Sequence, residues 1–302
     1  MAAPEFTYEM ERGFLPGHRA CAGCGQAAAV RVVMEVVGPK TVVANATGCL
    51  EVFSTPHPES AWGVPWVHSL FENVAAVASG IEAALKKQGK LDGVKVLAFG
   101  GDGATLDIGF GALSGMFERG HDVLYLCMDN EAYMNTGVQR SSATPPAART
   151  ATTMAVGSKP GNVFGTGKNL PLIAMAHRIP YVATASVANL RDLEVKVMRA
   201  MDIAGSRYIH IHVPCPLGWG SEPADTIKIA RLAVESGLFP LFEAEDGEVT
   251  DRYTLRRRVP VTEYLKLQKR FAHLFGKEPD VRTIAAIQAM ADHNVAHFGL
   301  AP

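Results

Sequence analysis

Two sets of residues in this sequence have side chains and spacings suited to holding charged ligands. The first is Gly101-Asp102-Gly103, followed later in the chain by Asp129-Asn130. Glycine has no Cβ and adopts positive φ, so a glycine-rich backbone can approach a bulky anion closely. Mg²⁺ prefers oxygen ligands and is usually held by one or two carboxylates together with phosphate oxygens. The pattern therefore predicts a Mg²⁺–diphosphate site, whereas Gly-Asp-Gly alone would fit an ordinary βα turn.

The second set is the cysteines, of which the chain contains five. Cys21 and Cys24 form a C-x-x-C pair in a glycine-rich loop, and Cys49 and Cys215 each follow a predicted strand. An odd, uneven set argues against a disulfide framework. Four converging thiolates predict a structural zinc site or an iron–sulfur cluster, and the spacing does not decide between them. A redox-active Cys21/Cys24 pair is a third interpretation, which leaves the other two unexplained. Cys127 lies inside a predicted strand, and we expect it to be buried in the core.

The apolar pattern predicts the elements that position these side chains. Residues 94–99 and 123–128 are short apolar runs flanked by turn residues, which is typical of buried strands. Between them we expect a helix that stops at Gly120. Its apolar positions are Ile108, Leu113, Met116 and Phe117. Asp102 and Asp129 would then follow neighbouring strands, at the edge where open α/β sheets bind their ligands.

The remaining elements are expected to extend the same sheet. Expected strands are residues 41–44, 181–185 and 208–213, the last strand of the sheet, with 241–245 as a short strand beyond it. Expected helices begin near Gln26 and cover residues 170–177, 190–204 and 225–237. Residues 141–170 are rich in Ser, Thr, Pro and Gly, and we expect a long irregular segment near the active site.

These expectations define the fold class and the domain organisation. We predict an α/β fold with an open, mostly parallel sheet and helices on both faces in residues 1–245. Residues 246–302 are predicted to form a C-terminal helical arm for subunit contacts, with helices at 262–275 and 280–296. The arm contains the basic run Arg256-Arg257-Arg258, which is either a solvated face or a docking surface.

Composition excludes several classes of protein. The chain has 302 residues, with 29 basic and 30 acidic side chains, so its charge gives no reason to expect a nucleic-acid partner. No apolar stretch is long enough to span a membrane, and the first residues lack the apolar region of a secretory signal. We therefore expect a cytoplasmic protein with no membrane partner. A G-x-S-x-G motif is absent, so the sequence offers no support for that type of hydrolase.

Several motifs together resemble the β subunit of the 2-oxoacid:ferredoxin oxidoreductases, the pyruvate:ferredoxin oxidoreductase group. They are HRACAGCGQ (18–26), TGCLEVFS (47–54), VPWVHSLFENVAAVASG (64–80), GGDGATLDIGFGALSG (100–115), MDNEAYMNTGVQRSSATP (128–145) and the late Cys215. They occur in family order over roughly residues 12–242. The Gly-Asp-Gly and Asp-Asn pair resembles the thiamine diphosphate (TPP) fingerprint. The resemblance implies a TPP-binding fold.

The resemblance also implies ligands for specific residues. Cys21, Cys24, Cys49 and Cys215 would bind a [4Fe–4S] cluster close to TPP. Asp102, Asn130 and the carbonyl of Ala132 would bind Mg²⁺. The implied cofactor-binding residues are Gly48, Cys49, Gly101, Asp102, Gly103, Ala104, Asn130, Ala132, Tyr133, Asn135 and Thr136. Asn135 would be the catalytic residue, with its amide facing the substrate carbonyl; a turn residue is the alternative.

The implied activity is TPP-dependent oxidative decarboxylation of a 2-oxo acid to CO₂ and its acyl-CoA. A cluster within reach of TPP would accept electrons one at a time and pass them to ferredoxin, or through a flavin subunit to NAD. Pyruvate is the default substrate, and a branched or aryl 2-oxo acid such as phenylglyoxylate is an alternative. A non-redox TPP lyase or synthase half-site and a non-catalytic electron-transfer or scaffolding subunit are competing hypotheses.

The resemblance further implies partner subunits. The chain contains one diphosphate-type unit, so an α subunit would supply the glutamate that activates TPP, and the chain alone would be inactive. A γ subunit and a ferredoxin-like δ subunit are expected, because this chain lacks the C-x-x-C-x-x-C-x-x-x-C-P runs that bind additional clusters. His68 is expected to be a hydrogen-bonded packing residue rather than a general base. His18-Arg19 either covers the cysteine loop or is a solvated pair.

Overall fold

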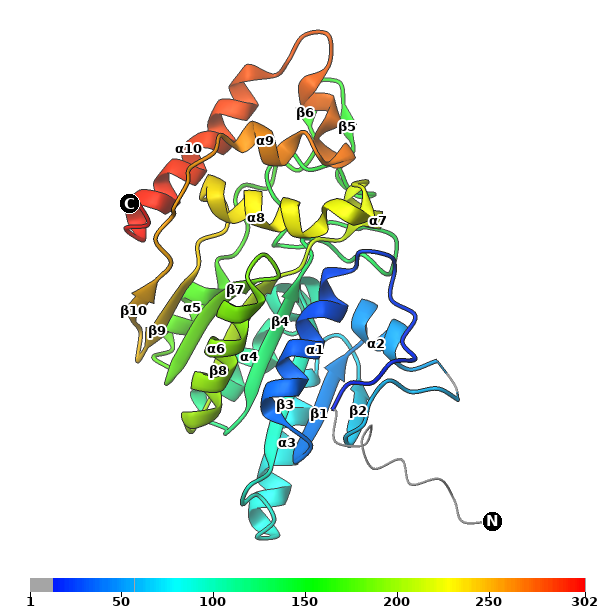
Figure 1. Ribbon diagram of the computed structural model, residues 1–302, viewed down its shortest axis with the longest axis vertical. Coiled ribbons are helices and arrows are strands. Elements are labelled where there is room, and N and C mark those ends of the chain that lie inside the picture. The colour runs from blue at the N-terminus through cyan, green and yellow to red at the C-terminus, as the bar shows by residue number, and fades with distance from the viewer. Residues whose placement is uncertain (1–12, 57, 302) are drawn as a thin grey trace.

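The computed structural model describes residues 13–56 and 58–301. Residues 1–12, whose composition argues against a secretory signal, lie outside the described part. One sheet has eight strands in the order β10-β9-β7-β8-β4-β3-β1-β2 (Figure 1). The strands are β1 (Thr41–Ala46), β2 (Trp66–Ser69), β3 (Lys95–Gly101), β4 (Leu124–Asp129), β7 (Tyr181–Ser186), β8 (Arg207–His212), β9 (Phe242–Glu245) and β10 (Glu248–Arg252). β5 (Ala155–Val156) and β6 (Lys159–Pro160) form a separate small hairpin.

The sheet is mostly parallel, as the sequence predicted. β2, β1, β3, β4, β8 and β7 run parallel to one another, whereas β9 pairs antiparallel with β7, and β10 pairs antiparallel with β9. The expectation that residues 208–213 form the last strand is wrong, because β8 is central and two strands lie beyond β7 at that edge. The Phe242 amide donates 2.9 Å to the Thr184 hydroxyl, which fixes β9 beside β7. The sheet thus continues past residue 245.

Helices cover both faces of the sheet, which explains the continuous apolar character of the central strands. α1 (Gly25–Val37) and α6 (Leu190–Asp202) lie on one face; α3 (Val74–Lys87), α4 (Phe110–Glu118) and α5 (Leu170–Ala176) lie on the other (Figure 1). Alternate residues of β3 enter the two cores: Leu97 packs with the α1 and α6 side chains, and Val96 with those of α3 and α4. This two-sided core holds the carboxyl ends of β1, β3 and β4 in place.

The helix expected after Gly-Asp-Gly begins with a π-helical turn, η1 (Gly103–Ile108), before α4. The wider turn is closed by a hydrogen bond of 2.9 Å from the Gly109 amide to the Ala104 carbonyl. Ile108 is 58% exposed, so its prediction as an apolar position on the buried helix face is wrong. The extra residue per turn shifts Ile108 outward while Leu113 stays buried. π-Turns are rare and often lie at functional sites.

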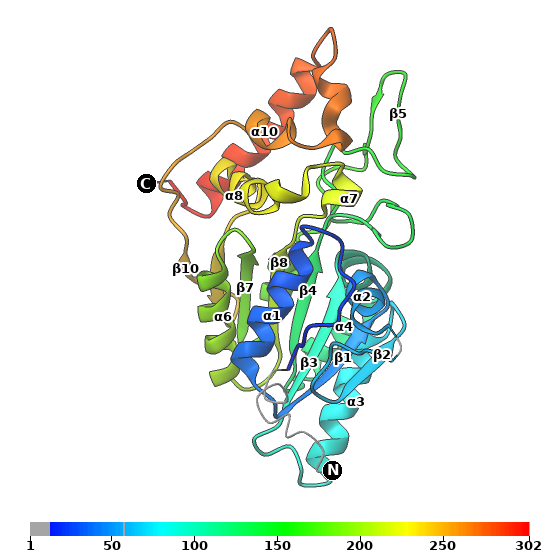
Figure 2. The ribbon, with the colours of Figure 1, turned by 45° about the vertical axis from the view of Figure 1, so that its right-hand side comes forward.

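The C-terminal part lies over the carboxyl ends of the strands (Figure 2). It contains α7 (Pro216–Trp219), η2 (Pro223–Asp225), α8 (Thr226–Ser236), α9 (Val261–Leu265), η3 (Lys269–Phe275) and α10 (Val281–His297). The prediction of one helix over 262–275 is wrong: Gln268 is extended, with φ −125° and ψ 119°, and separates α9 from a 3₁₀ segment. A third core joins these helices around Trp219 and Phe271.

Residues 141–170 are mostly turns, apart from the hairpin β5–β6, which Figure 2 shows projecting from the molecule. This agrees with the predicted irregular segment. Among the described residues, no helix is long and apolar enough to cross a membrane.

Candidate active site

A cleft of about 340 Å³ lies at the carboxyl ends of β1, β3 and β4. Every residue that the sequence implied for cofactor binding lines it: Gly48, Cys49, Gly101, Asp102, Gly103, Ala104, Asn130, Ala132, Tyr133, Asn135 and Thr136. Gln26, Thr47, Phe71 and Met134 also line the cleft, and sequence reasoning missed them. All four lie inside the motifs quoted for the family resemblance, a signal that could have identified them.

Asp102 lies at the deepest part of this site. It is 1% exposed and precedes the π-turn η1. The Ser141 hydroxyl, from the irregular segment, donates a hydrogen bond of 2.5 Å to its Oδ2. Burial, and then the nearby Asp129 carboxylate, raise the pKa of Asp102 well above its usual value. A cation bound here would stabilise the charged carboxylate and reverse that shift.

An oxygen atom of Asp102, the Ala132 carbonyl oxygen and the Asn130 side chain lie close together. The side-chain oxygen of Asn130 lies 2.8 Å from the Ala132 carbonyl oxygen and 3.1 Å from Oδ1 of Asp102, and its nitrogen faces Nε2 of Gln26 at 3.0 Å. These contacts are repulsive unless a cation lies among the oxygens or the amide turns over and donates to them. A carboxylate, an amide oxygen and a backbone carbonyl are the hard ligands that Mg²⁺ takes. The residues present therefore fit a Mg²⁺ ion.

The glycines beside Asp102 serve different needs. A Cβ at Gly103 would lie 2.3 Å from the Tyr133 ring, whose hydroxyl donates 3.0 Å to the Gly103 carbonyl. A Cβ at Gly101 would meet nothing within 4 Å, although Gly101 lines the cleft. Gly103 is thus required by packing within the protein, whereas the space beside Gly101 belongs to the cleft.

Asn135 is exposed at the mouth of the cleft, in a turn that other residues hold. The Tyr133 amide donates 2.9 Å to the Gln139 carbonyl, and the Thr136 hydroxyl donates 2.6 Å to the Gln139 side chain. The turn presents an amide that is free to face a ligand.

The four cysteines implied as cluster ligands lie in one neighbourhood, three of them at helix N-termini. Cys24 precedes α1, Cys215 precedes α7, and Cys49 is the first residue of α2 (Cys49–Ser54). The Gly218 amide lies 3.4 Å from the Cys215 sulfur and donates to it, and backbone amides beside Cys24 donate to its sulfur. Partial positive charge at helix N-termini and amide donors both stabilise thiolates.

Packing between distant segments brings these cysteines together. The Thr226 hydroxyl donates 2.6 Å to the Gly23 carbonyl, so the C-x-x-C loop packs on the segment that follows α7. A Cβ at Gly23, where φ is +72°, would lie 2.4 Å from the Pro223 carbonyl oxygen. Only glycine therefore allows this approach.

The thiols influence one another, and the Asp102 carboxylate influences Cys49. Burial, followed by Cys215, Cys24 and Cys21, raises the pKa of Cys49 to about 12, and Asp102 contributes to the same shift. In the described part of the chain, no three side chains of His, Cys, Asp or Glu are close enough to hold a single metal ion. Cys127, in contrast, is fully buried in β4, as predicted.

A network of buried charges, which the sequence did not reveal, lies behind the cleft. His210 Nε2 lies 2.7 Å from Asp129 Oδ2. Despite burial, the neighbouring Cys127 and Asp129 raise the pKa of His210 well above its usual value. Arg270, from η3, pairs with Glu131, which lies between Asn130 and Ala132. Despite burial, Arg270 and His212 lower the pKa of Glu131. No local motif signals contacts between residues so far apart.

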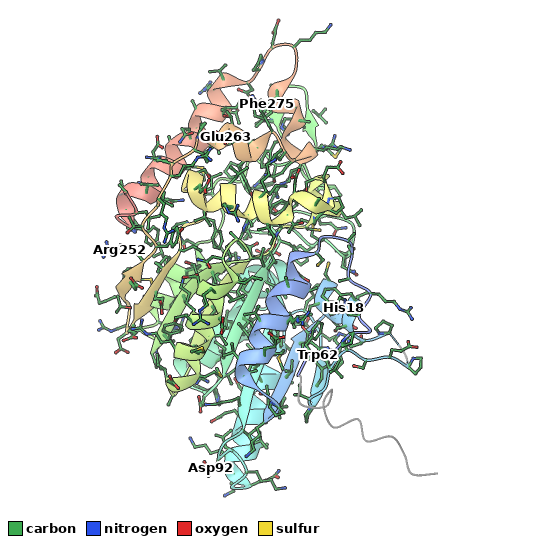
Figure 3. All side chains as sticks on the ribbon, viewed as in Figure 1. His18, Trp62, Asp92, Arg252, Glu263 and Phe275 are labelled. Atoms are coloured by element: carbon green, nitrogen blue, oxygen red, sulfur yellow. The ribbon has the colours of Figure 1, made fainter. Side chains whose placement is uncertain are left out.

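The other singled-out polar residues lie at the surface. His68 is 42% exposed on the edge strand β2. It is nevertheless hydrogen-bonded and packed, as expected: its Nε2 lies 2.8 Å from the Thr47 hydroxyl, and its ring stacks on Trp66 with centroids 6.1 Å apart. His18 stacks on Phe14 with ring centroids 5.5 Å apart and lies beside the cysteine loop (Figure 3). In the basic run, Arg257 and Arg258 pair with acids of the same arm.

The comparisons with known proteins identify the family. The protein family described as "Thiamine pyrophosphate enzyme, C-terminal TPP binding domain" matches residues 46–211 of this chain, from the end of β1 into β8. Pyruvate synthase subunit PorB of Methanosarcina barkeri (strain Fusaro / DSM 804) is 56% identical to this chain over 284 residues. That match covers 94% of this chain and 96% of the relative. The chain belongs to the family of 2-oxoacid:ferredoxin oxidoreductase β subunits.

Other members and one solved structure agree with this assignment. The PorB subunit of Methanocaldococcus jannaschii is 51% identical, with 97% of this chain and 98% of that one covered. Ketoisovalerate oxidoreductase subunit VorB of Pyrococcus abyssi (strain GE5 / Orsay) is 44% identical, with 91% and 90% covered. The 2-oxoglutarate:ferredoxin oxidoreductase of Magnetococcus marinus has the same fold, with a TM-score of 0.57 and 22% identity over 73% of this chain and 79% of that one.

Proposed function

We propose that this chain carries TPP with Mg²⁺ and one [4Fe–4S] cluster, and is the catalytic β subunit of a heteromeric 2-oxoacid oxidoreductase. The observation that carries the proposal is the position of Cys49. Its side chain lines the cleft that contains Asp102, and its thiol belongs to the group formed with Cys21, Cys24 and Cys215. An organic cofactor in the cleft and a cluster among the thiols would be immediate neighbours.

The proposed ligands follow from the donor atoms. Asp102, Asn130 and the Ala132 carbonyl would hold Mg²⁺, because the Asn130 side-chain amide lies 2.8 Å from the Ala132 carbonyl oxygen and 3.1 Å from Asp102 Oδ1, so these three groups are already gathered. The sulfurs of Cys21, Cys24, Cys49 and Cys215 would hold the cluster. The family assignment favours the cluster over zinc, because an oxidoreductase of this family needs a one-electron acceptor beside its cofactor. It therefore also favours a redox enzyme over a non-redox TPP lyase or synthase.

Bound TPP would supply a stabilised carbanion for decarboxylation, and the cluster would supply a one-electron acceptor. The chain's own residues would bind and orient the reactants. The Asn135 amide can donate to the oxygen of a 2-oxo acid and stabilise negative charge there without a change of protonation. Phe71 and Met134 form apolar parts of the wall, where they exclude water from the reacting groups. Coenzyme A would accept the acyl group.

The cleft also indicates what partners must provide. Asp102 is the one carboxylate among the described residues that line it, and it is committed to the metal. A glutamate that activates the cofactor ring must therefore come from another chain, which we assign to an α subunit. The proposed complex also includes γ and ferredoxin-like δ subunits, with ferredoxin or a flavin/NAD subunit as the final acceptor, in the cytoplasm. The helical part after β10 would add subunit contacts.

Pyruvate is the proposed substrate, because relatives named pyruvate synthase subunits reach 56% identity. A branched 2-oxo acid is the second candidate, because a relative named ketoisovalerate oxidoreductase reaches 44% identity. A screen of pyruvate, 2-oxoisovalerate and phenylglyoxylate, with a viologen acceptor and the complete complex, ranks them by kcat/KM.

The cofactor proposal is tested by anaerobic purification of the complex, followed by iron, sulfide and TPP analysis. We expect about four irons and four sulfides for each copy of this chain, in addition to those that the proposed δ subunit carries. Asp102→Asn should abolish Mg²⁺-dependent TPP binding. The matched control is Asp92→Asn, an exposed residue at the opposite end of the sheet (Figure 3), which should bind TPP normally. Normal TPP binding by Asp102→Asn, or zinc in place of iron, would overturn the proposal.

A further inference from the structure

The chemistry proposed above does not use the buried ion pair behind the cleft. We propose that Arg270, supplied by the C-terminal segment η3, is a positioning residue for the Mg²⁺–diphosphate loop, residues 129–132. It acts on the loop through Glu131 and Trp219 and touches no ligand. The inference rests on the proposed function, because it assigns Arg270 a role at that metal site.

The loop contains a strained residue that its surroundings must hold. Glu131 has φ +67°, a left-handed conformation that non-glycine residues rarely adopt. Such a conformation persists only where neighbouring contacts over-determine it. The Glu131 amide donates 2.8 Å to Asp129 Oδ1, and its carbonyl accepts 2.7 Å from the Thr144 hydroxyl. Its carboxylate accepts a hydrogen bond from Arg270 Nη2. Asn130 and Ala132, the two metal ligands of this loop, flank the strained residue on either side.

Arg270 is itself fixed on several sides. It is 4% exposed, and its Nε donates 2.9 Å to the side-chain oxygen of Gln268. Its guanidinium carbon lies 3.8 Å from the centre of the Trp219 ring. Its backbone carbonyl accepts 3.0 Å from the Arg149 amide. Gln268, at the break between α9 and η3, thus also contacts this side chain. A charge held this firmly constrains the groups that it contacts.

Trp219 provides the second connection to the loop. Its indole Nε1 donates 2.8 Å to the Asn130 carbonyl, while its own backbone amide donates 2.9 Å to the Cys215 carbonyl. Arg270 therefore contacts two of the groups that fix the loop, the carboxylate of Glu131 and the indole bound to Asn130. The Thr144 hydroxyl and His212 contact Glu131 independently of Arg270. Removal of Arg270 would free both of its contacts at once. The expected consequence is a weaker Mg²⁺ site, with the fold retained.

The test measures TPP binding by the complete complex as Mg²⁺ is varied. Arg270→Met should raise the Mg²⁺ concentration for half-maximal TPP binding at least tenfold, and should lower Tm because Glu131 loses its partner. The double variant Arg270→Met/Glu131→Gln should recover much of the Tm, because no uncompensated charge remains. Its Mg²⁺ requirement should stay raised, because neither side chain can fix the loop.

Two controls separate positioning from general stability. Ile287→Ala removes a buried side chain of the same C-terminal core and should lower Tm without changing the Mg²⁺ requirement. Arg258→Met removes an exposed arginine of the arm and should change neither. A wild-type Mg²⁺ requirement in Arg270→Met would overturn the inference alone. The inference would also be overturned if the Mg²⁺ concentration for half-maximal TPP binding rose whenever Tm fell, in Ile287→Ala as well as in the Arg270 variants. A wild-type complex that binds no TPP would overturn the inference and the proposed function together.

Discussion

The substitution Gly103→Ala tests whether the glycine after Asp102 is required by packing or by the ligand. The added Cβ would lie 2.3, 2.4 and 2.6 Å from three atoms of the Tyr133 ring, well inside van der Waals contact. Either the ring or the π-turn must move. Overpacking of this kind costs about 1–3 kcal/mol. At about 2 °C per kcal/mol for a chain of this size, Tm should fall by roughly 2–6 °C.

Gly101→Ala is the matched control on the other side of the same aspartate. Its Cβ would meet no protein atom within 4 Å, so Tm should remain within about 1 °C of the wild type. The methyl group would nevertheless occupy the cleft, so TPP affinity should fall. In Gly103→Ala, TPP affinity should fall as well, because Tyr133 lines the cleft.

The double variant Gly103→Ala/Tyr133→Ala checks the assigned clash. Removal of the ring should eliminate the cost of the extra methyl group, so adding Gly103→Ala to Tyr133→Ala should leave Tm nearly unchanged. Thermal melts of the ligand-free protein and TPP titrations by fluorescence provide the measurements. A full loss of stability from Gly103→Ala in the Tyr133→Ala background would refute the packing argument. So would a destabilised Gly101→Ala.

Other predictions concern the charges of the site. In iron-free protein, Cys49 should react slowly with iodoacetamide at neutral pH, because burial and Cys215 raise its pKa to about 12; exposed Cys21 should react first in peptide mapping. In metal-free protein, the raised pKa of Asp102 in the folded state stabilises the fold at low pH. This stabilisation is complete below the usual pKa of an aspartate and is lost as pH rises through the raised pKa. In thermal melts, Tm should depend less on pH in Asp102→Asn than in the wild type. An equal dependence in the two proteins would contradict the raised pKa of Asp102. Ser141→Ala should weaken Mg²⁺-dependent TPP binding by about 1.5–3 kcal/mol, as measured by calorimetry, because it removes a hydrogen bond to a charged group.

The sequence predicted the parts of the fold and the cleft that depend on local patterns. Asp102 and Asn130 follow the consecutive strands β3 and β4, which are neighbours in the sheet. The motif and the rule that ligands bind at the carboxyl ends of parallel strands were therefore enough to predict that the two residues lie close together. The apolar runs of β3 and β4 were recognisable because both faces of these strands are covered. The grouping of Cys215 with Cys21 and Cys24 came from family resemblance, since no spacing rule connects residues so far apart.

The parts that the sequence did not predict depend on long-range contacts or unusual backbone. Trp219 and Arg270 contact the metal loop through tertiary packing, which leaves no periodic signal. The π-turn cannot be distinguished from an α-helical start by apolar spacing, so Ile108 was assigned to the wrong face. The break at Gln268 was missed because residues on both sides are helix formers.

The late position of Arg270 has a consequence for biosynthesis. Its partner Glu131 is 139 residues earlier in the chain. At translation rates of about 5–20 residues per second, roughly 7–28 s separate the synthesis of the two. Until residue 270 has been synthesised and has folded back, the Glu131 carboxylate lacks this arginine, and the loop depends on earlier contacts such as the hydrogen bond from the Thr144 hydroxyl.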